Sequence, residues 1–315
     1  MSATAADRRI RSLRGTKPAV DPWTAHGSLL EDERRPNGIV ERALTIFLAG
    51  AECPFTCSFC DLWRYTIDGP TPIGALPAQI AQSLATTQAE GLDRIKLYNA
   101  SNFFDRRAVP PEDRSRIAEQ CASFGGVTVE SHASTIGPAV TDFARSLDGR
   151  LEVAMGLETI HPVAMTHLNK WLDLDRFDRA AGFLAKHGID LRVFVLLGAP
   201  GIPTGEAVDW AIRSAEFAAQ RGASLVSIIP VRGGNGEMER LAAAGLFVAP
   251  TLRQLEQALD GCVGWRETVV TADLWDVDRL AACDGCREAR GARLRRMNGS
   301  GVAEPPVGCA ACDGA

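Results

Sequence analysis

Short apolar runs alternate along this chain with longer segments in which apolar residues recur at helical spacing. The apolar runs predict buried strands at 43–50, 94–99, 127–132, 151–158, 189–197 and 224–230. The segments between them predict helices near 76–90, 111–124, 138–147, 174–187 and 204–221. Because strands that alternate with helices form βαβ units, the pattern predicts an α/β fold with a parallel sheet and right-handed crossovers.

Six strands of this kind suit a (β/α)6 partial barrel, with a Rossmann-like open sheet as the alternative. Both architectures place the active site at the carboxyl ends of the strands. We divide the chain into a polar N-terminal extension (1–40), a core barrel (41–232) and a small cysteine-rich C-terminal extension (233–315). The C-terminal extension predicts helices near 237–244 and 251–259 and a strand at 267–272.

Composition narrows the class of protein further. The 315 residues are 46% hydrophobic, which suits a globular core, and their formal net charge of −5 does not predict a strongly basic surface for nucleic acid. The sequence shows neither a long apolar run nor an apolar signal segment, so we expect no membrane span and a cytoplasmic location. Nine cysteines in such a chain indicate metal binding rather than disulfides.

Three of these cysteines follow the first predicted strand. Cys53, Cys57 and Cys60 form a C-x3-C-x2-C loop. Three thiolates from one loop can hold three irons of a [4Fe–4S] cluster and leave the fourth iron open for a substrate or cofactor. A zinc knuckle or three free thiols are the alternatives, but zinc usually takes four ligands.

Four more cysteines form two C-x2-C pairs near the end of the chain, Cys283 with Cys286 and Cys309 with Cys312. The pairs resemble a zinc-ribbon framework, in which zinc would be structural. The same thiolates could instead ligate a fully coordinated second [4Fe–4S] cluster. We favour the cluster, because the protein would already be loaded with iron and sulfide, and keep zinc as the alternative. The basic stretch 287–296 between the pairs indicates an exposed helix face or, less commonly, a phosphate-facing surface.

Polar side chains also gather where the predicted strands end. Carboxylates and amides in such positions can hold an ammonium, a ribose or a substrate hydroxyl, although helix caps and structural ion pairs use the same residues. Those after the second to fifth strands are Ser101, Asn102, Glu130, His132, Glu158, Lys170 and Gly198.

The cysteine spacing, with the aromatic Phe59 before the last cysteine, resembles the signature of the radical S-adenosylmethionine (SAM) superfamily. Within it, the order of strand-end motifs over roughly 43–260 resembles the branch that contains the radical SAM subunit of archaeosine synthase and the Elp3-like tRNA-modifying proteins. One stretch departs from that branch: residues 99–102 read Asn-Ala-Ser-Asn where the branch tends to Thr-Ser-Gly-Ser.

The resemblance implies cofactor-binding roles for six residues. Phe59 would pack on the adenine of SAM, Ser101 and Asn102 would lie near its methionine amino group, and Glu130 and Glu158 would approach its ribose or amine. Gly198 would let the fifth strand pass close to the adenosine.

Two further residues are candidates for catalysis. His132 would be a proton donor, or else a hydrogen-bonded histidine at a strand end. Lys170 would bind an anionic substrate or the SAM carboxylate, or else be a solvated lysine.

The predicted function is therefore that of a radical SAM enzyme, which cleaves SAM reductively and abstracts hydrogen from a small nucleoside- or sugar-like substrate. A one-electron reductant such as a flavodoxin or ferredoxin would serve it. Modification of a tRNA nucleoside, including radical sulfur insertion, is one alternative, although the charge balance does not favour nucleic acid. A non-catalytic iron–sulfur or zinc redox sensor is the other.

Overall fold

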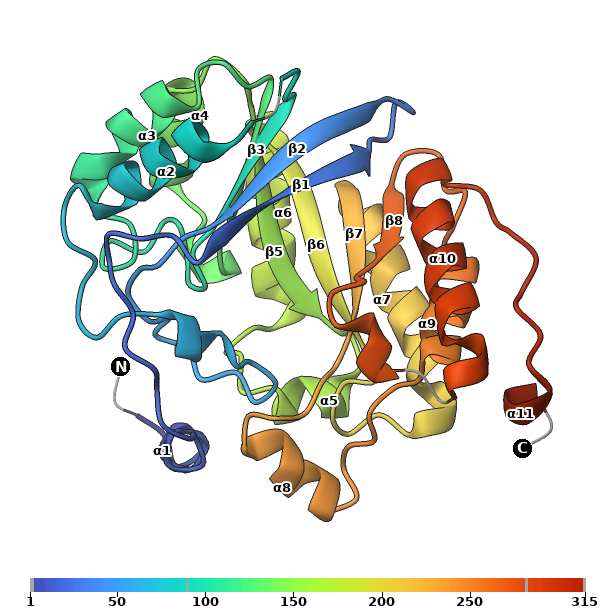
Figure 1. Cartoon of the computed structure of the whole chain (residues 1–315). Coiled ribbons are helices and arrows are strands. Elements are labelled where there is room, and N and C mark those ends of the chain that lie inside the picture. The colour runs from blue at the N-terminus through green and yellow to red at the C-terminus, as the bar shows by residue number, and fades with distance from the viewer. Residues whose placement is uncertain (1–2, 89, 281–282, 314–315) are drawn as a thin grey trace.

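Eight strands form one sheet, and their order in the sheet is their order in the chain. The computed structural model describes residues 3–88, 90–280 and 283–313. Strand β1 pairs antiparallel with β2, and all other neighbouring strands are parallel. The sheet curls into a partial barrel (Figure 1) built from β1 (Gly27–Arg34), β2 (Val40–Phe47), β3 (Arg94–Tyr98), β4 (Gly126–Glu130), β5 (Arg150–Glu158), β6 (Asp190–Leu197), β7 (Ala223–Pro230) and β8 (Val269–Ala272).

Helices that connect the parallel strands cover the outer face of this sheet, and the main apolar core lies between the two layers. They are α2 (Ala75–Thr86), α3 (Arg114–Gln120), α4 (Pro138–Arg145), α6 (Leu174–Lys186), α7 (Ala207–Gln220) and α9 (Leu252–Asp260). Smaller elements are α1 (Ala5–Ser12), α5 (Pro162–His167), α8 (Glu237–Ala243), α11 (Ala310–Asp313) and the 3-10 turns η1 (Leu62–Tyr65), η2 (Pro111–Asp113), η3 (Ala133–Thr135), η4 (Thr204–Glu206) and η5 (Val277–Leu280).

The last long helix, α10 (Asp284–Ser300), contacts both edge strands of the open sheet, β1 and β8 (Figure 1). The Asn298 side chain accepts from the backbone N–H of Ala272 at 2.9 Å and donates to its carbonyl at 2.8 Å. It thereby satisfies backbone groups that an edge strand would otherwise leave unpaired. Helix α10 thus packs across the gap that the partial barrel leaves open.

The predicted fold class, a partial barrel of six parallel βα units, is confirmed. Two strands lie beyond the six: β8, predicted at 267–272, joins the same sheet, and β1 was not predicted. Strand β1 escaped the sequence pattern because Leu29 and Leu30 are exposed while Glu33, a charged residue, is buried. The sheet therefore extends past both boundaries of the predicted core, 41–232.

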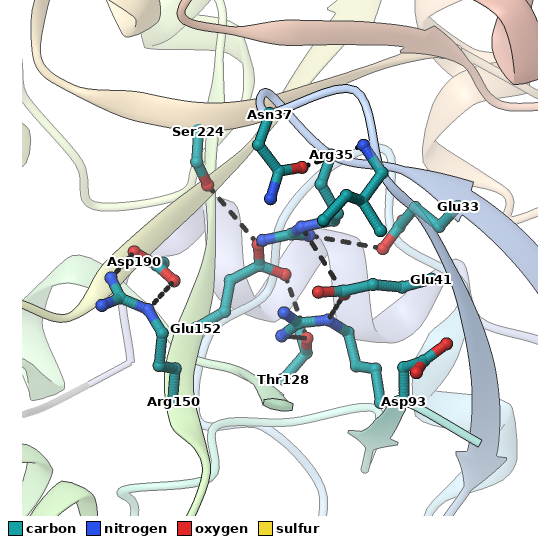
Figure 2. Close-up of polar contacts among 12 residues, drawn as sticks. Glu33, Arg35, Asn37, Glu41, Asp93, Thr128, Arg150, Glu152, Asp190 and Ser224 are labelled. Carbon is teal, nitrogen blue, oxygen red and sulfur yellow. Dashed lines mark hydrogen bonds and ion pairs between the residues drawn. The ribbon is translucent and has the colours of Figure 1, made fainter. Parts of the chain in front are cut away.

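Charged side chains fill the interior of the barrel near the amino ends of the strands (Figure 2). Glu152 accepts from Arg35 at 2.7 Å and from Arg192 at 2.9 Å. Glu33 accepts from Arg192 at 2.5 Å and from Lys96 at 3.0 Å. Burial alone would raise the pKa of Glu33, but the charges of Arg192 and Lys96 outweigh it and hold that pKa at about 2.

This network is balanced in charge. Four carboxylates pair with four cations, namely Glu31, Glu33, Glu41 and Glu152 with Arg35, Arg94, Lys96 and Arg192. Because each buried charge has an opposite partner, the desolvation cost of every member is offset only while the whole set is present.

We predict that Glu152→Gln lowers the free energy of unfolding by about 3 kcal/mol, because it leaves Arg35 and Arg192 buried beside a neutral amide. Asp190→Asn is the control, since it breaks an ion pair whose Arg150 side chain is 68% exposed, and should cost less than about 1 kcal/mol. Urea unfolding at pH 7 measures both. Equal effects of the two changes would contradict a stabilising role for the network.

Candidate active site at the carboxyl ends of the strands

A cavity of about 540 Å³ opens at the carboxyl ends of the central strands. Ten of the predicted site residues line it, from the cysteine loop, from the ends of β3 to β5 and from the segment before α6. They are Cys53, Cys57, Phe59, Cys60, Ser101, Asn102, Glu130, His132, Glu158 and Lys170. The structure therefore brings together side chains that are separated by more than a hundred positions in the sequence.

The cysteine loop is held from several distant parts of the chain. The Ser58 N–H donates to the Leu168 carbonyl at 2.9 Å, and the Asn235 amide donates to the Ser58 carbonyl at 2.7 Å. Phe59 lines the cavity and packs against a second apolar cluster that includes Leu168. These contacts fix the backbone on which all three thiols stand.

Burial raises the pKa of Cys53, Cys57 and Cys60, that of Cys60 to about 12. The thiols would therefore ionise at neutral pH only if a cation such as iron occupied the site, since a bound metal stabilises the thiolate. Asn102 supports this end of the loop, because its amide donates to the Cys53 sulfur at 3.4 Å. The three cysteines fit a thiolate-ligated metal cluster.

Glu130, at the end of β4, organises the loop that follows β3. Its carboxylate accepts from the backbone N–H of Asn99 at 2.9 Å and also from those of Ala100 and Ser101. The cradle requires Ala100 to adopt a left-handed φ of 53°. Burial raises the pKa of Glu130 to about 7, although these backbone bonds oppose the shift. Ser101 Oγ is buried in the same loop with no partner in the protein, so it is available to a ligand.

His132 is enclosed rather than free. Its Nε2 lies 3.1 Å from the Lys170 carbonyl, which can only accept, so Nε2 carries the proton and Nδ1 accepts from Ser134 at 2.8 Å. Its ring stacks on Phe55 of the cysteine loop, with centroids 4.1 Å apart. Burial lowers the pKa of His132 to about 3. These contacts favour a neutral positioning residue over the predicted proton donor.

Lys170 forms a buried ion pair with Glu158 inside the cavity. The Lys170 side chain is 13% exposed, so the alternative of a solvated lysine is wrong. Burial tends to lower the pKa of Lys170, but Glu158 and the Cys57 sulfur outweigh burial and raise it. Gly156 makes the pair possible, because a Cβ at that position would overlap both the Glu158 carboxylate and the Lys170 ammonium.

Gly198 lies outside the residues that line the cavity. Its left-handed φ of 76° and a would-be Cβ contact with Pro250 at 3.2 Å explain a glycine there without any ligand. That Gly198 lets the fifth strand pass close to the adenosine stays a prediction.

The N-terminal segment, predicted only as an extension, docks on the cysteine loop. Asp7 in α1 is buried and accepts from the hydroxyl of Thr56 and, at 2.9 Å, from the amide of Asn169. Glu52, next to Cys53, pairs with three basic residues of the same segment, Arg11, Arg14 and Lys17. No local sequence motif marks Asp7, because its role depends on tertiary contacts alone.

Basic and aromatic side chains line the outer part of the cavity: Arg64, Tyr65, Arg232, Trp275 and Arg279. Trp275 is 61% exposed and the Arg279 side chain 70% exposed. Arg232 pairs with Asp273 at 3.1 Å, and Arg279 lies 3.5 Å from Asp276. An aromatic face beside guanidinium groups suits a ligand with a planar ring and an anionic group.

The four C-terminal cysteines form a separate group, outside the lining of the cavity. The sulfurs of Cys283, Cys286, Cys309 and Cys312 all lie within 4.8 Å of one another, which fits a metal site. Within the described residues, no helix is long and apolar enough to cross a membrane.

The fold resembles the partial barrel of radical SAM enzymes, the fold class that the sequence predicted. The structure is similar to that of the Elp3 protein of Methanocaldococcus infernus, with a TM-score of 0.52 and 12% identity over 70% of this chain and 58% of that one. It is also similar to a methylornithine synthase, with a TM-score of 0.51 and 15% identity over 77% of this chain and 67% of the other.

The sequence is also similar to that of a curated protein. The archaeosine synthase subunit beta of Methanosarcina acetivorans is 23% identical over 193 residues, which cover 58% of this chain and 56% of the relative. The chain spans about half the length of the curated relatives it matches. No family model matches the sequence.

We predict that Asp7→Ala weakens retention of the [4Fe–4S] cluster that the sequence predicts, because it removes the shared acceptor of Thr56 and Asn169 and so loosens the cysteine loop. Iron bound after anaerobic reconstitution and gel filtration should fall at least twofold, and the cluster absorbance should bleach faster in air. Asp142→Ala, a change at an exposed position in α4, is the control. Equal iron content and bleaching rate in the two variants would exclude a positioning role for Asp7.

Proposed function

We propose that this protein is a radical SAM enzyme that abstracts hydrogen from a small nucleoside- or sugar-like substrate. One observation carries the proposal: three cysteines converge at the carboxyl end of a partial barrel, at the wall of a cavity that also holds Asn102, Glu130 and the Glu158–Lys170 pair. Cys53, Cys57 and Cys60 would hold a [4Fe–4S] cluster with one open iron. When bound, the cluster and SAM supply a 5′-deoxyadenosyl radical, which takes hydrogen from the substrate.

The residues of the chain would bind, orient and shield the reactants. Ser101 Oγ, buried without a protein partner, would donate to or accept from SAM, and Phe59 would contact its adenine. The Lys170 ammonium would attract a carboxylate while Glu158 limits its net charge. The aromatic and guanidinium groups at the cavity mouth would receive a planar, anionic portion of the substrate and exclude water.

The proposal extends to partners and to the second metal site. A flavodoxin or ferredoxin would supply the electron, in the cytoplasm, where thiolates remain reduced. The four C-terminal cysteines would hold a further metal centre.

A tRNA nucleoside is the second candidate substrate. The similarity to an archaeosine synthase subunit favours it, as do the three arginines at the cavity mouth. The chain's net charge of −5 favours the small molecule.

We predict that the purified protein, reconstituted anaerobically, forms 5′-deoxyadenosine and methionine from SAM when dithionite is added. The Cys53/Cys57/Cys60→Ala triple variant should lose about four irons and all SAM cleavage. Cys121→Ala, which changes a buried thiol in the core, should keep both. A triple variant that retains its iron would overturn the proposal, and a wild-type protein with the cluster but no SAM cleavage would favour the redox sensor.

The two substrate classes differ in their dependence on salt. Binding of unmodified tRNA should be weak, above about 10 μM at 150 mM salt, with no change between wild type and an Arg64/Arg279→Gln double variant. Binding of a nucleoside monophosphate, measured by isothermal titration calorimetry, should weaken about tenfold in the same variant. Tight tRNA binding that falls steeply with salt and is lost in this variant would instead assign the site to RNA.

A further inference from the structure

The spacing of the C-terminal sulfurs selects among the metal centres that four cysteines can bind. Cys283 Sγ lies 3.3 Å from Cys286 Sγ, 3.5 Å from Cys309 Sγ and 3.2 Å from Cys312 Sγ, and the sulfurs of Cys286 and Cys312 are 3.7 Å apart. A tetrahedral zinc ion with bonds of about 2.3 Å sets its ligands about 3.8 Å apart. A [4Fe–4S] cluster places its irons between the thiolates and spreads them to roughly 6 Å.

The cysteine loop offers an internal comparison. Among the described residues, the only group of three or more potential ligands whose atoms all lie within 4.8 Å of one another is the C-terminal four. Cys53, Cys57 and Cys60 do not gather so closely, although all three stand on one short loop. The three loop thiols are thus spaced widely and the four C-terminal thiols closely. The close spacing of the C-terminal thiols leaves room for one ion.

Nearby cations suit a site with excess negative charge. Four thiolates around one divalent ion carry a net charge of −2. Arg290 donates to Cys286, and Arg253 donates to the Cys312 carbonyl at 3.1 Å. Such contacts outside the ligand shell orient the ligands and offset their charge.

Hydrogen bonds from α10 hold the segment that leads back to this site. Arg293 is almost fully buried in α10 and donates to the carbonyls of Glu304 at 2.5 Å and Pro305 at 2.9 Å. Its guanidinium also pairs with Asp260 of α9 at 2.6 Å. Arg293 therefore holds the segment that precedes Cys309 and Cys312 against α10. This segment leads back to the start of α10, where Cys283 is the N-cap residue.

Turn η5 connects the wall of the cavity to α10. Turn η5 contacts α10 and ends three residues before Cys283. Trp275, Asp276 and Arg279, in and just before η5, line the cavity. A metal ion that fixes the start of α10 would therefore fix this wall as well.

We propose that the four C-terminal cysteines bind one zinc ion, which holds the 275–280 wall of the substrate cavity in place. The second half rests on the proposed function, because it takes the cavity as the substrate site. The zinc replaces the second [4Fe–4S] cluster that we favoured from the sequence.

Metal counting on anaerobically purified full-length protein tests the first half. We expect about one zinc with about four irons per chain. Cys309→Ser should lose the zinc and keep the iron, the Cys53/Cys57/Cys60→Ala variant should lose the iron and keep the zinc, and Cys262→Ala, at a buried thiol outside both sites, should keep both. About eight irons, or four irons lost in Cys309→Ser, would establish a cluster in the tail and overturn the proposal.

Hydrogen exchange tests the second half without using activity. Removal of zinc from wild-type protein by a chelator should raise the exchange rate of amides in 275–280 at least tenfold, and added zinc should restore it. Exchange that stays unchanged after zinc loss would overturn the link to the cavity wall. Wild-type protein with zinc but no iron would refute the proposed function alone and leave the zinc site standing.

Discussion

The balanced set of buried charges inside the barrel is the constraint on which the remaining structure depends. Glu152 and Arg192 stand on neighbouring parallel strands, and Glu33 accepts from Arg192 from the antiparallel strand β1. A charge in this interior is tolerated only with its partner, so the network ties the register of β1 to that of the parallel strands. The carboxyl ends of the strands are then in register at the opposite end of the barrel, where the cavity forms.

At the carboxyl ends of the strands, the cysteine loop has little regular structure of its own. Its conformation depends on contacts with residues that are distant in the sequence. Asp7, Asn102, Leu168 and Asn235 each bond to it, and they come from four separate parts of the chain. Such an arrangement places ligands precisely only after the barrel has formed. Burial raises the pKa of each loop thiol, so the thiols would ionise at neutral pH only when a metal binds.

The sequence predicted what depends on local pattern and missed what depends on tertiary partners. Periodicity identified strands β2 to β8, and motif spacing identified the cysteines. Strand β1 escaped because its inner face carries charges, and Asp7 escaped because a lone aspartate in a polar segment has no local signature. Arg290 and Arg293 were assigned to an exposed helix face, yet both are buried, since Glu256 and Asp260 of α9 supply partners that no local pattern reveals.

In the two sets of cysteines, the distances between the sulfurs depend on how the surrounding backbone is held. The loop thiols are spread around a cavity wall whose backbone is held by hydrogen bonds, so they can surround a cluster and leave one face open to the cavity. The C-terminal thiols come from the start of α10 and from a segment that Arg293 folds back against it, and this pairing of two short C-x2-C units draws the sulfurs together. A closed tetrahedral ion at the second set would leave no open coordination position, so the chemistry that we propose would belong to the first set and the second set would stabilise the wall beside it.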